Sequence, residues 1–177
     1  YIANNHPNLF FADDTKIILD SLIQMSEFYV ENLPESFAKG MFECLLMLIA
    51  QMNEHAKFEE LFQPVVKALE NPSENQPVVT SLYIISNLAK EKTKIPVSLP
   101  DRNLSPEAVD VIEMNMTKAD QKDELVDFQY GQSFAPLVCQ QVFELAKQVI
   151  VSPTASDDEI ELLLGALSSL ICCFDTF

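Results

Sequence analysis

Glycine and histidine are scarce in this chain of 177 residues, which contains three glycines and two histidines. Glycine normally makes up roughly 7% of a protein. Tight hairpin turns and phosphate-binding loops depend on it, because it reaches backbone conformations that other residues avoid. The shortage excludes a glycine-rich nucleotide-binding loop. It favours helices that are joined at proline and asparagine corners instead.

Catalytic and metal-binding motifs are also missing from the sequence. Neither His6 nor His55 has a cysteine or carboxylate at metal-ligand spacing, and no GxGxxG, GxxxxGK or GxSxG motif occurs. The acidic pairs at residues 13–14 and 157–158 precede apolar helical runs, where helix capping explains them better than a two-carboxylate site. We therefore expect no catalytic residue, no metal and no cofactor, and a protein that is not an enzyme.

Cysteines are few, and none of them stands in a CxxC spacing. Cys44, Cys139, Cys172 and Cys173 all fall within apolar helical patterns, and the adjacent pair cannot readily bridge to itself. We expect reduced thiols in the core, which is typical of a cytosolic or nuclear protein.

Basic residues are also few. The chain has 11 Lys and Arg against 27 Asp and Glu, which gives a net charge of −16. Direct binding to nucleic acid or to an anionic membrane needs the opposite sign. An acidic surface fits either a basic protein partner or simple solubility, and the composition leaves both interpretations open.

No apolar run is long enough to span a membrane. The longest, residues 162–174, is interrupted by glycine and serine and falls short of the roughly 20 residues that a bilayer requires. No basic segment precedes an apolar one as in a secretory signal. We expect a soluble protein. Because the first residue is Tyr1 rather than Met, we also expect a piece of a longer chain or a processed product.

What the sequence does contain is helical periodicity over nearly its whole length, with apolar residues three and four positions apart. Prolines at the starts of several segments suit the first turn of a helix. Pro64 instead falls inside a segment, where it should kink or split the helix. Helices are predicted at residues 13–30, 34–52, 54–69, 75–92, 105–115, 134–151 and 157–177.

Two segments are predicted to be loops between helix pairs. Residues 93–104 include Pro96 and Pro100, which forbid a continuous helix. Residues 117–130 begin with a highly charged stretch, TKADQKDEL. No strand pattern competes with the helical one elsewhere.

The order of these segments predicts an all-α fold. Two helices joined by a short turn lead through another short turn to two more, in units of about 40 residues, the spacing of HEAT and armadillo repeats. We therefore expect residues 1–177 to form a single segment of antiparallel helix pairs that stack as an α-solenoid.

The last predicted helix has too much apolar surface for a helix that buries one face. Ile160, Leu164, Leu167 and Ile171 share one side, while Leu163 and its neighbours fill adjoining sides. In a solenoid, a helix packs on its own partner and on the units before and after it. We expect this helix to be sandwiched in that way, or to bind a partner protein, although the centre of a closed bundle would also suit it.

The stretch FAPLVCQQVFELAKQVIVSPTASDDEIELLLGALSSLICCFDTF resembles the importin-β (karyopherin-β) superfamily, particularly its exportin-type members. The similarity lies in a helix with LVCQQVF, a short polar turn, an acidic helix start and ELLLGALSSLICCF, and it extends over residues 105–177. It implies a superhelical receptor that binds the GTPase Ran and carries cargo through nuclear pores.

The sequence therefore predicts a non-enzymatic protein-binding solenoid, located in cytoplasm and nucleus, that recognises Ran or basic or signal-bearing cargo. A scaffold or regulatory subunit of another complex remains an alternative, as does a compact bundle that binds a small apolar ligand. The candidate partner-binding residues belong to the charged connection. They are Asp120, Asp123, Glu124 and Asp127.

Overall fold

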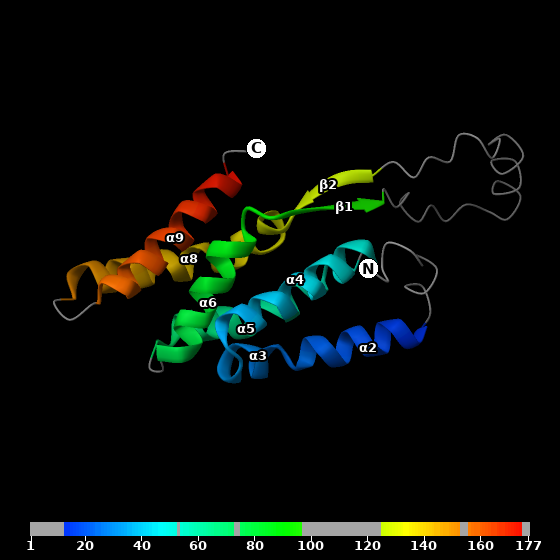
Figure 1. Cartoon of the computed structure of the whole chain (residues 1–177), viewed down its shortest axis with the longest axis horizontal. Coiled ribbons are helices and arrows are strands. Elements are labelled where there is room, and N and C mark those ends of the chain that lie inside the picture. The colour runs from blue at the N-terminus through cyan, green and yellow to red at the C-terminus, as the bar shows by residue number, and fades with distance from the viewer. Residues whose placement is uncertain (1–12, 53, 73–74, 97–124, 153–155, 175–177) are drawn as a thin grey trace, which may run out of the picture.

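A computed structural model describes residues 13–52, 54–72, 75–96, 125–152 and 156–174. This part of the chain is predominantly helical, as the periodicity predicts, and adds one two-stranded ribbon (Figure 1). The predicted helix at residues 105–115 lies outside the described residues. The elements are α2 (Asp13–Gln24), α3 (Ser26–Asn32), α4 (Glu35–Gln51), α5 (Lys57–Glu70), α6 (Asn75–Leu88), β1 (Lys92–Pro96), β2 (Leu125–Gln129), α8 (Tyr130–Val151) and α9 (Asp157–Phe174).

The helix starts and breaks follow from local chemistry. α9 begins with a reciprocal cap, in which the Ser156 N–H donates to the Glu159 carboxylate (2.9 Å) and the Glu159 N–H donates to Ser156 Oγ (3.3 Å). The expected first helix is in fact two, because the chain turns at Met25 between α2 and α3. The expectation that Pro64 divides its helix is wrong in its stronger form, since α5 continues through it. Packing outweighs the one backbone hydrogen bond that proline removes.

The helices follow one another across the molecule in pairs, from α2 to α9 (Figure 1). The first pair consists of α4 and of the interrupted helix α2–α3, both parts of which contact α4; the middle pair is α5 with α6, and the last pair is α8 with α9. The pairs also contact each other, because α5 lies against α3 and α8, while α6 lies against α4 and α9. The middle pair, α5 and α6, therefore has a helix pair on each side.

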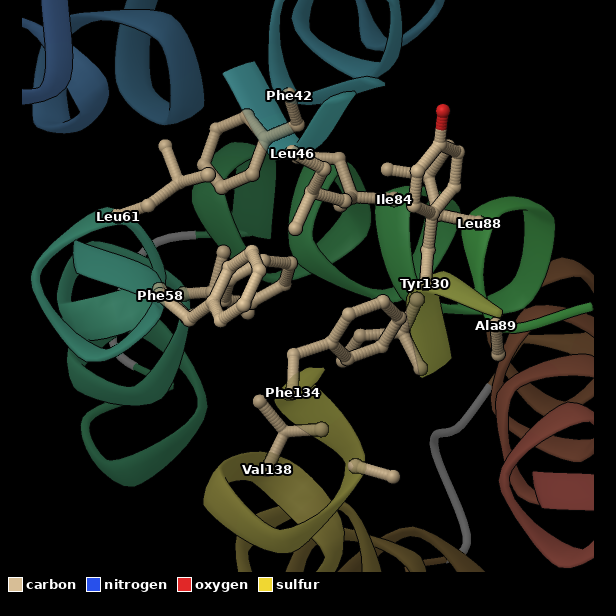
Figure 2. Packing of buried hydrophobic residues seen from close by; sticks show 14 of the residues in the cluster. Phe42, Leu46, Phe58, Leu61, Ile84, Leu88, Ala89, Tyr130, Phe134 and Val138 are labelled. Carbon is tan, nitrogen blue, oxygen red and sulfur yellow. The ribbon is translucent and has the colours of Figure 1, made fainter. Parts of the chain in front are cut away.

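Three aromatic rings in contact connect the pairs through the interior. Phe62 of α5 meets Phe42 of α4 edge to face, at 5.3 Å between ring centroids, and lies nearly parallel to Phe134 of α8 at 4.4 Å. All three side chains are fully buried. Figure 2 shows Phe42, Phe58 and Phe134 projecting into this shared interior from α4, α5 and α8. Such pairs add about 0.5–1.5 kcal/mol each beyond the burial of their area.

The helix that is buried on most sides is α6. Its buried residues include Thr80 and Ser81 as well as apolar residues, and the last helix pair satisfies backbone carbonyls at its C-terminal end. Ser169 Oγ donates to the Ser86 carbonyl (2.9 Å), and both Gln129 Nε2 (3.0 Å) and Cys173 Sγ (3.3 Å) donate to the Ala89 carbonyl. These bonds replace the intrahelical partners that a helix end lacks.

For residues 93–96 and 125–130, the ribbon corrects the prediction of loops without strands, and the rest of the two predicted loops lies outside the described residues. Lys92–Pro96 and Leu125–Gln129 pair antiparallel, and Tyr130 already belongs to α8, four residues earlier than expected. Backbone pairing holds the two segments together, and the partly buried ring of Phe128 stacks on Phe58 of α5, at 5.8 Å between ring centroids. Each strand has five residues and pairs with a segment that is distant in the sequence. Periodicity along the chain therefore could not reveal the pairing.

Replacing Gly131 with alanine should destabilise the fold, because the added Cβ would overlap Cys173 Sγ and lie 2.5 Å from the Ala89 carbonyl oxygen. We expect a loss of about 1–3 kcal/mol in the free energy of unfolding, typical of overpacking, measured by urea denaturation. Gly40→Ala is the matched control. Nothing lies within 4 Å of its added Cβ, so alanine should stabilise α4 by about 0.5–1 kcal/mol. Equal effects of the two substitutions would contradict the close contact at Gly131.

Candidate protein-binding surface

Large exposed apolar side chains occur only on the first and last helix pairs of the described structure. None belongs to α5 or α6. On the first pair they are Ile17, Ile18, Met25, Phe28 and Phe37, and on the last pair they are Phe143, Val151, Ile160, Leu164 and Ile171. Exposed apolar patches of this kind are typical of interaction surfaces.

The largest set on one helix is a row along α9, which we call the outer stripe: Ile160, Leu164, Leu167 and Ile171. Their spacing of four, three and four residues places them on one face of a helix. Ile160 is 38% exposed, Leu164 57% and Ile171 60%, while Leu167 is partly buried. The outer stripe is wide enough to receive the side chains of another helix.

The opposite side of α9 faces the interior. Leu163, Ala166, Leu170 and Cys173 are buried there, and the Ser169 hydroxyl, also buried, bonds to α6. Ser169 lies about half a turn around the helix from the outer stripe. The outer stripe therefore points away from α6. The side of α9 that faces α6 is buried, and the side that carries the outer stripe is exposed.

A similar arrangement holds on α8. Phe134 stacks on Phe62 of the middle pair, while Phe143, nine residues later and half a turn around the helix, is 56% exposed. Lys147 lies over the Phe143 ring, 5.1 Å from its centroid, and pairs with Glu144 at 2.8 Å. The last helix pair thus exposes large apolar side chains on both of its helices.

The charge beside the outer stripe has one sign. α9 contains Asp157, Asp158, Glu159 and Glu161 and no basic residue. Asp157, Asp158 and Glu161 are exposed. Helical geometry places Asp157 and Glu161 next to the outer stripe, on the side of Ser168. The apolar row therefore has an acidic edge near the start of α9.

The acidic site expected from the sequence lies mostly outside the described residues. Asp120, Asp123 and Glu124 lie outside them. Asp127 is exposed on β2 and stands opposite Lys94 of β1 in the ladder. The neighbouring lysine offsets its charge at that position.

The cysteines differ from the expectation of core thiols. None of the four, all of them in the described part of the chain, forms a disulfide, but Cys44 and Cys172 are exposed and Cys139 is partly buried, so only Cys173 among them is a core residue. Burial raises the pKa of the Cys173 thiol, and the neighbouring Cys172 raises it further. The thiol therefore stays protonated at neutral pH and donates to the Ala89 carbonyl rather than acting as a nucleophile.

A cleft of about 390 Å³ lies between the middle and last helix pairs. Its walls are mostly apolar, with Val78 and Leu82 from α6, Val149 from α8 and Leu162 from α9, and Glu159 lines it as well. The volume falls in the range of small-molecule sites. The Glu159 carboxylate already accepts a hydrogen bond from the Ser156 N–H at the start of α9. It therefore has less capacity to bind a ligand in the cleft.

Other kinds of site find no support in the described part of the chain. No three His, Cys, Asp or Glu side chains there come together in a way that could hold a metal ion. None of the helices within the described ranges has the length and hydropathy of a bilayer span. Comparison with protein-family models, with curated proteins and with solved structures gives no match for this chain.

Sequence reasoning identified α9 as excessively apolar but did not separate its covered side from its open side. A helical projection distinguishes the two sides, since Leu163 and Leu164 lie about 100° apart. It does not say which side α6 occupies, because that depends on contacts between residues that are distant in the sequence.

The adjacent residues Leu163 and Leu164 provide a direct test of which side is open. Leu163 is 3% exposed and Leu164 57%. Leu163→Ala should lower the free energy of unfolding by about 2–5 kcal/mol because it leaves a cavity, whereas Leu164→Ala should change it by about 0.5 kcal/mol or less. Urea denaturation at low protein concentration measures both. If both substitutions cost the same, the outer stripe is covered in the free protein.

Proposed function

We propose that this chain is a segment of a HEAT-type α-solenoid that binds other proteins without catalysing a reaction. The order of packing supports the proposal, since each helix pair follows its predecessor and the middle pair contacts both neighbours. In a solenoid, stability comes from contacts within repeats and between neighbouring repeats. The aromatic contacts from Phe42 through Phe62 to Phe134 are of that kind.

The observation that carries the proposal is the distribution of exposed apolar side chains. They are present on both end pairs and missing from the described middle pair. A closed bundle buries its apolar residues in one interior. A stack of repeats instead covers each inner pair on two sides and leaves the end faces of a segment apolar. The end faces are then sites where further helices or other proteins bind.

The more specific proposal is a nuclear transport receptor, active in cytoplasm and nucleus. It rests on the resemblance of residues 105–177 to the importin-β superfamily. The net charge of −16 agrees with it, because an acidic receptor surface attracts basic cargo or a basic face of Ran. A scaffold subunit of another complex would use the same surfaces, and partner identity separates the two.

One observation favours a different function. The cleft between α6, α8 and α9 could bind a small apolar ligand, as expected for a compact bundle. Its apolar lining is interrupted by Asn75, Gln148, Ser152 and Glu159. The open apolar faces at the two ends have no role in that function, so we place protein binding first.

Hydrogen exchange distinguishes a stack of repeats from a bundle. Leu19→Ala weakens α2 at one end and Leu163→Ala weakens α9 at the other, both at buried positions. In a stack, each substitution should lower amide protection mainly in its own pair, because repeats unfold from the ends. Exchange measured by mass spectrometry should show two separate regions of lost protection. A uniform loss over all helices for either variant would indicate one cooperative bundle.

Retention of Ran tests the transport proposal. The immobilised chain should retain Ran loaded with GTP in preference to Ran loaded with GDP, because a transport receptor of this superfamily distinguishes the two states. The bound fractions can be compared by gel densitometry, with the Gly131→Ala chain, expected to be destabilised, as a control for folding. Equal retention of both forms, or of neither, would contradict direct Ran recognition by this chain and leave the scaffold function.

A further inference from the structure

The outer stripe of α9 has residue spacings similar to those of the inner row of the same helix, on which another helix packs. On the inner side of α9, the buried residues Leu163, Ala166, Leu170 and Cys173 have spacings of three, four and three, and a helix, α6, packs against that side. The outer stripe has spacings of four, three and four. Both rows have the alternating spacing of a helix–helix seam. The outer stripe can therefore receive a helix in the way that the inner row receives α6.

The charge beside the outer stripe specifies the kind of helix. The exposed carboxylates of Asp157 and Glu161 border it, and α9 offers no basic residue to neutralise them. The nearest described cation on the other helix of this pair, Lys147, is already paired with Glu144 and lies over Phe143. A helix that binds here gains most if lysine or arginine flanks its own apolar row at the end near Asp157.

A second copy of this chain does not meet that requirement. Two α9 helices face to face would offer carboxylates and no base, so neither copy supplies the lysine or arginine that suits the acidic edge of the other. The exposed apolar face of α2 and α3 is acidic as well, with Asp20, Glu27 and Glu31. The lysines near them are already engaged, since Lys57 pairs with Asp20 and Lys67 with Glu27. Charge therefore disfavours both the symmetric and the head-to-tail contact between copies.

We propose that the outer stripe of α9 binds an amphipathic helix of another protein, one whose apolar row is flanked by lysine or arginine. This inference deepens the proposed function and rests on it. The contact has two components. Ile160, Leu164 and Ile171 lose their exposure to water, which supplies affinity. Asp157 and Glu161 select the basic partner and set its direction along α9.

Two synthetic peptides test the proposal. Both are fluorescein-labelled amphipathic helices with the same leucine row at spacings of four and three, and they differ in having lysine or glutamate beside the row. Fluorescence anisotropy with the full chain at about 0.15 M NaCl, the physiological ionic strength, gives the two affinities. We expect the lysine peptide to bind at least about tenfold more tightly than the glutamate peptide. Higher salt should reduce this preference.

Substitutions locate the contact. Leu164→Glu should weaken the lysine peptide at least about tenfold, because it places a charge in the apolar row. Ile171→Glu should act in the same direction, and it serves as a second variant if the first perturbs folding by circular dichroism. The matched control is Phe28→Glu, at an exposed apolar position on the other end of the molecule. It should leave the affinity unchanged.

A charge reversal tests selectivity separately from affinity. The double variant Glu161→Lys with Ser168→Lys changes the edge of the outer stripe without altering the α9 cap formed by Ser156 and Glu159. It should bind the glutamate peptide more tightly than the lysine peptide. Unchanged preference would overturn the role of the acidic edge.

The outcomes separate this inference from the function on which it rests. If exchange behaves as expected for stacked pairs but Leu164→Glu binds both peptides as well as the unmodified chain, the inference fails and the solenoid stands. Loss of binding with Phe28→Glu and not with Leu164→Glu would likewise overturn it. If exchange is uniform over the helices while the peptide results are as expected, the solenoid fails and the binding surface stands.

Discussion

The packing of Phe62 between Phe42 and Phe134 is the interaction on which the rest of the structure depends. It joins α4, α5 and α8, one helix from each of the successive pairs, in two ring contacts. Because all three rings are buried, the contacts fix how far apart the pairs lie and which sides face each other. With α5 held on its two neighbours, α6 is enclosed between α4 and α9. The faces of the end pairs that point away from these contacts remain open.

The end of the ribbon and the start of α8 also join the last helix pair to α6. Gln129, at the end of β2, donates to the Ala89 carbonyl, and the Tyr130 N–H donates to the Glu91 carbonyl at 3.0 Å. The start of α8 is thus hydrogen-bonded directly to the residues that follow α6. Gly131 lies so close to Ala89 and Cys173 that a side chain there would separate them. The last helix pair is positioned by this polar junction as much as by apolar contact.

The open face of α9 combines apolar and acidic side chains. α9 offers apolar side chains with carboxylates beside them and no base. Apolar burial supplies affinity but little selectivity, whereas the acidic edge rejects acidic partners, including a second copy of the chain. A protein with a net charge of −16 can thus expose apolar rows and still resist self-association.

The sequence by itself determined the helices, because apolar spacing and capping are local properties. It predicted α4, α5 and α9 close to their observed bounds, and it indicated that α9 is too apolar for a helix covered on one side. Only the tertiary structure decided that Leu163 is covered and Leu164 open, that Lys92–Pro96 pairs with Leu125–Gln129, and that Asp127 stands opposite a lysine. Each of these depends on contacts between residues that are distant in the sequence, and periodicity within one segment carries no information about which distant segment packs against it.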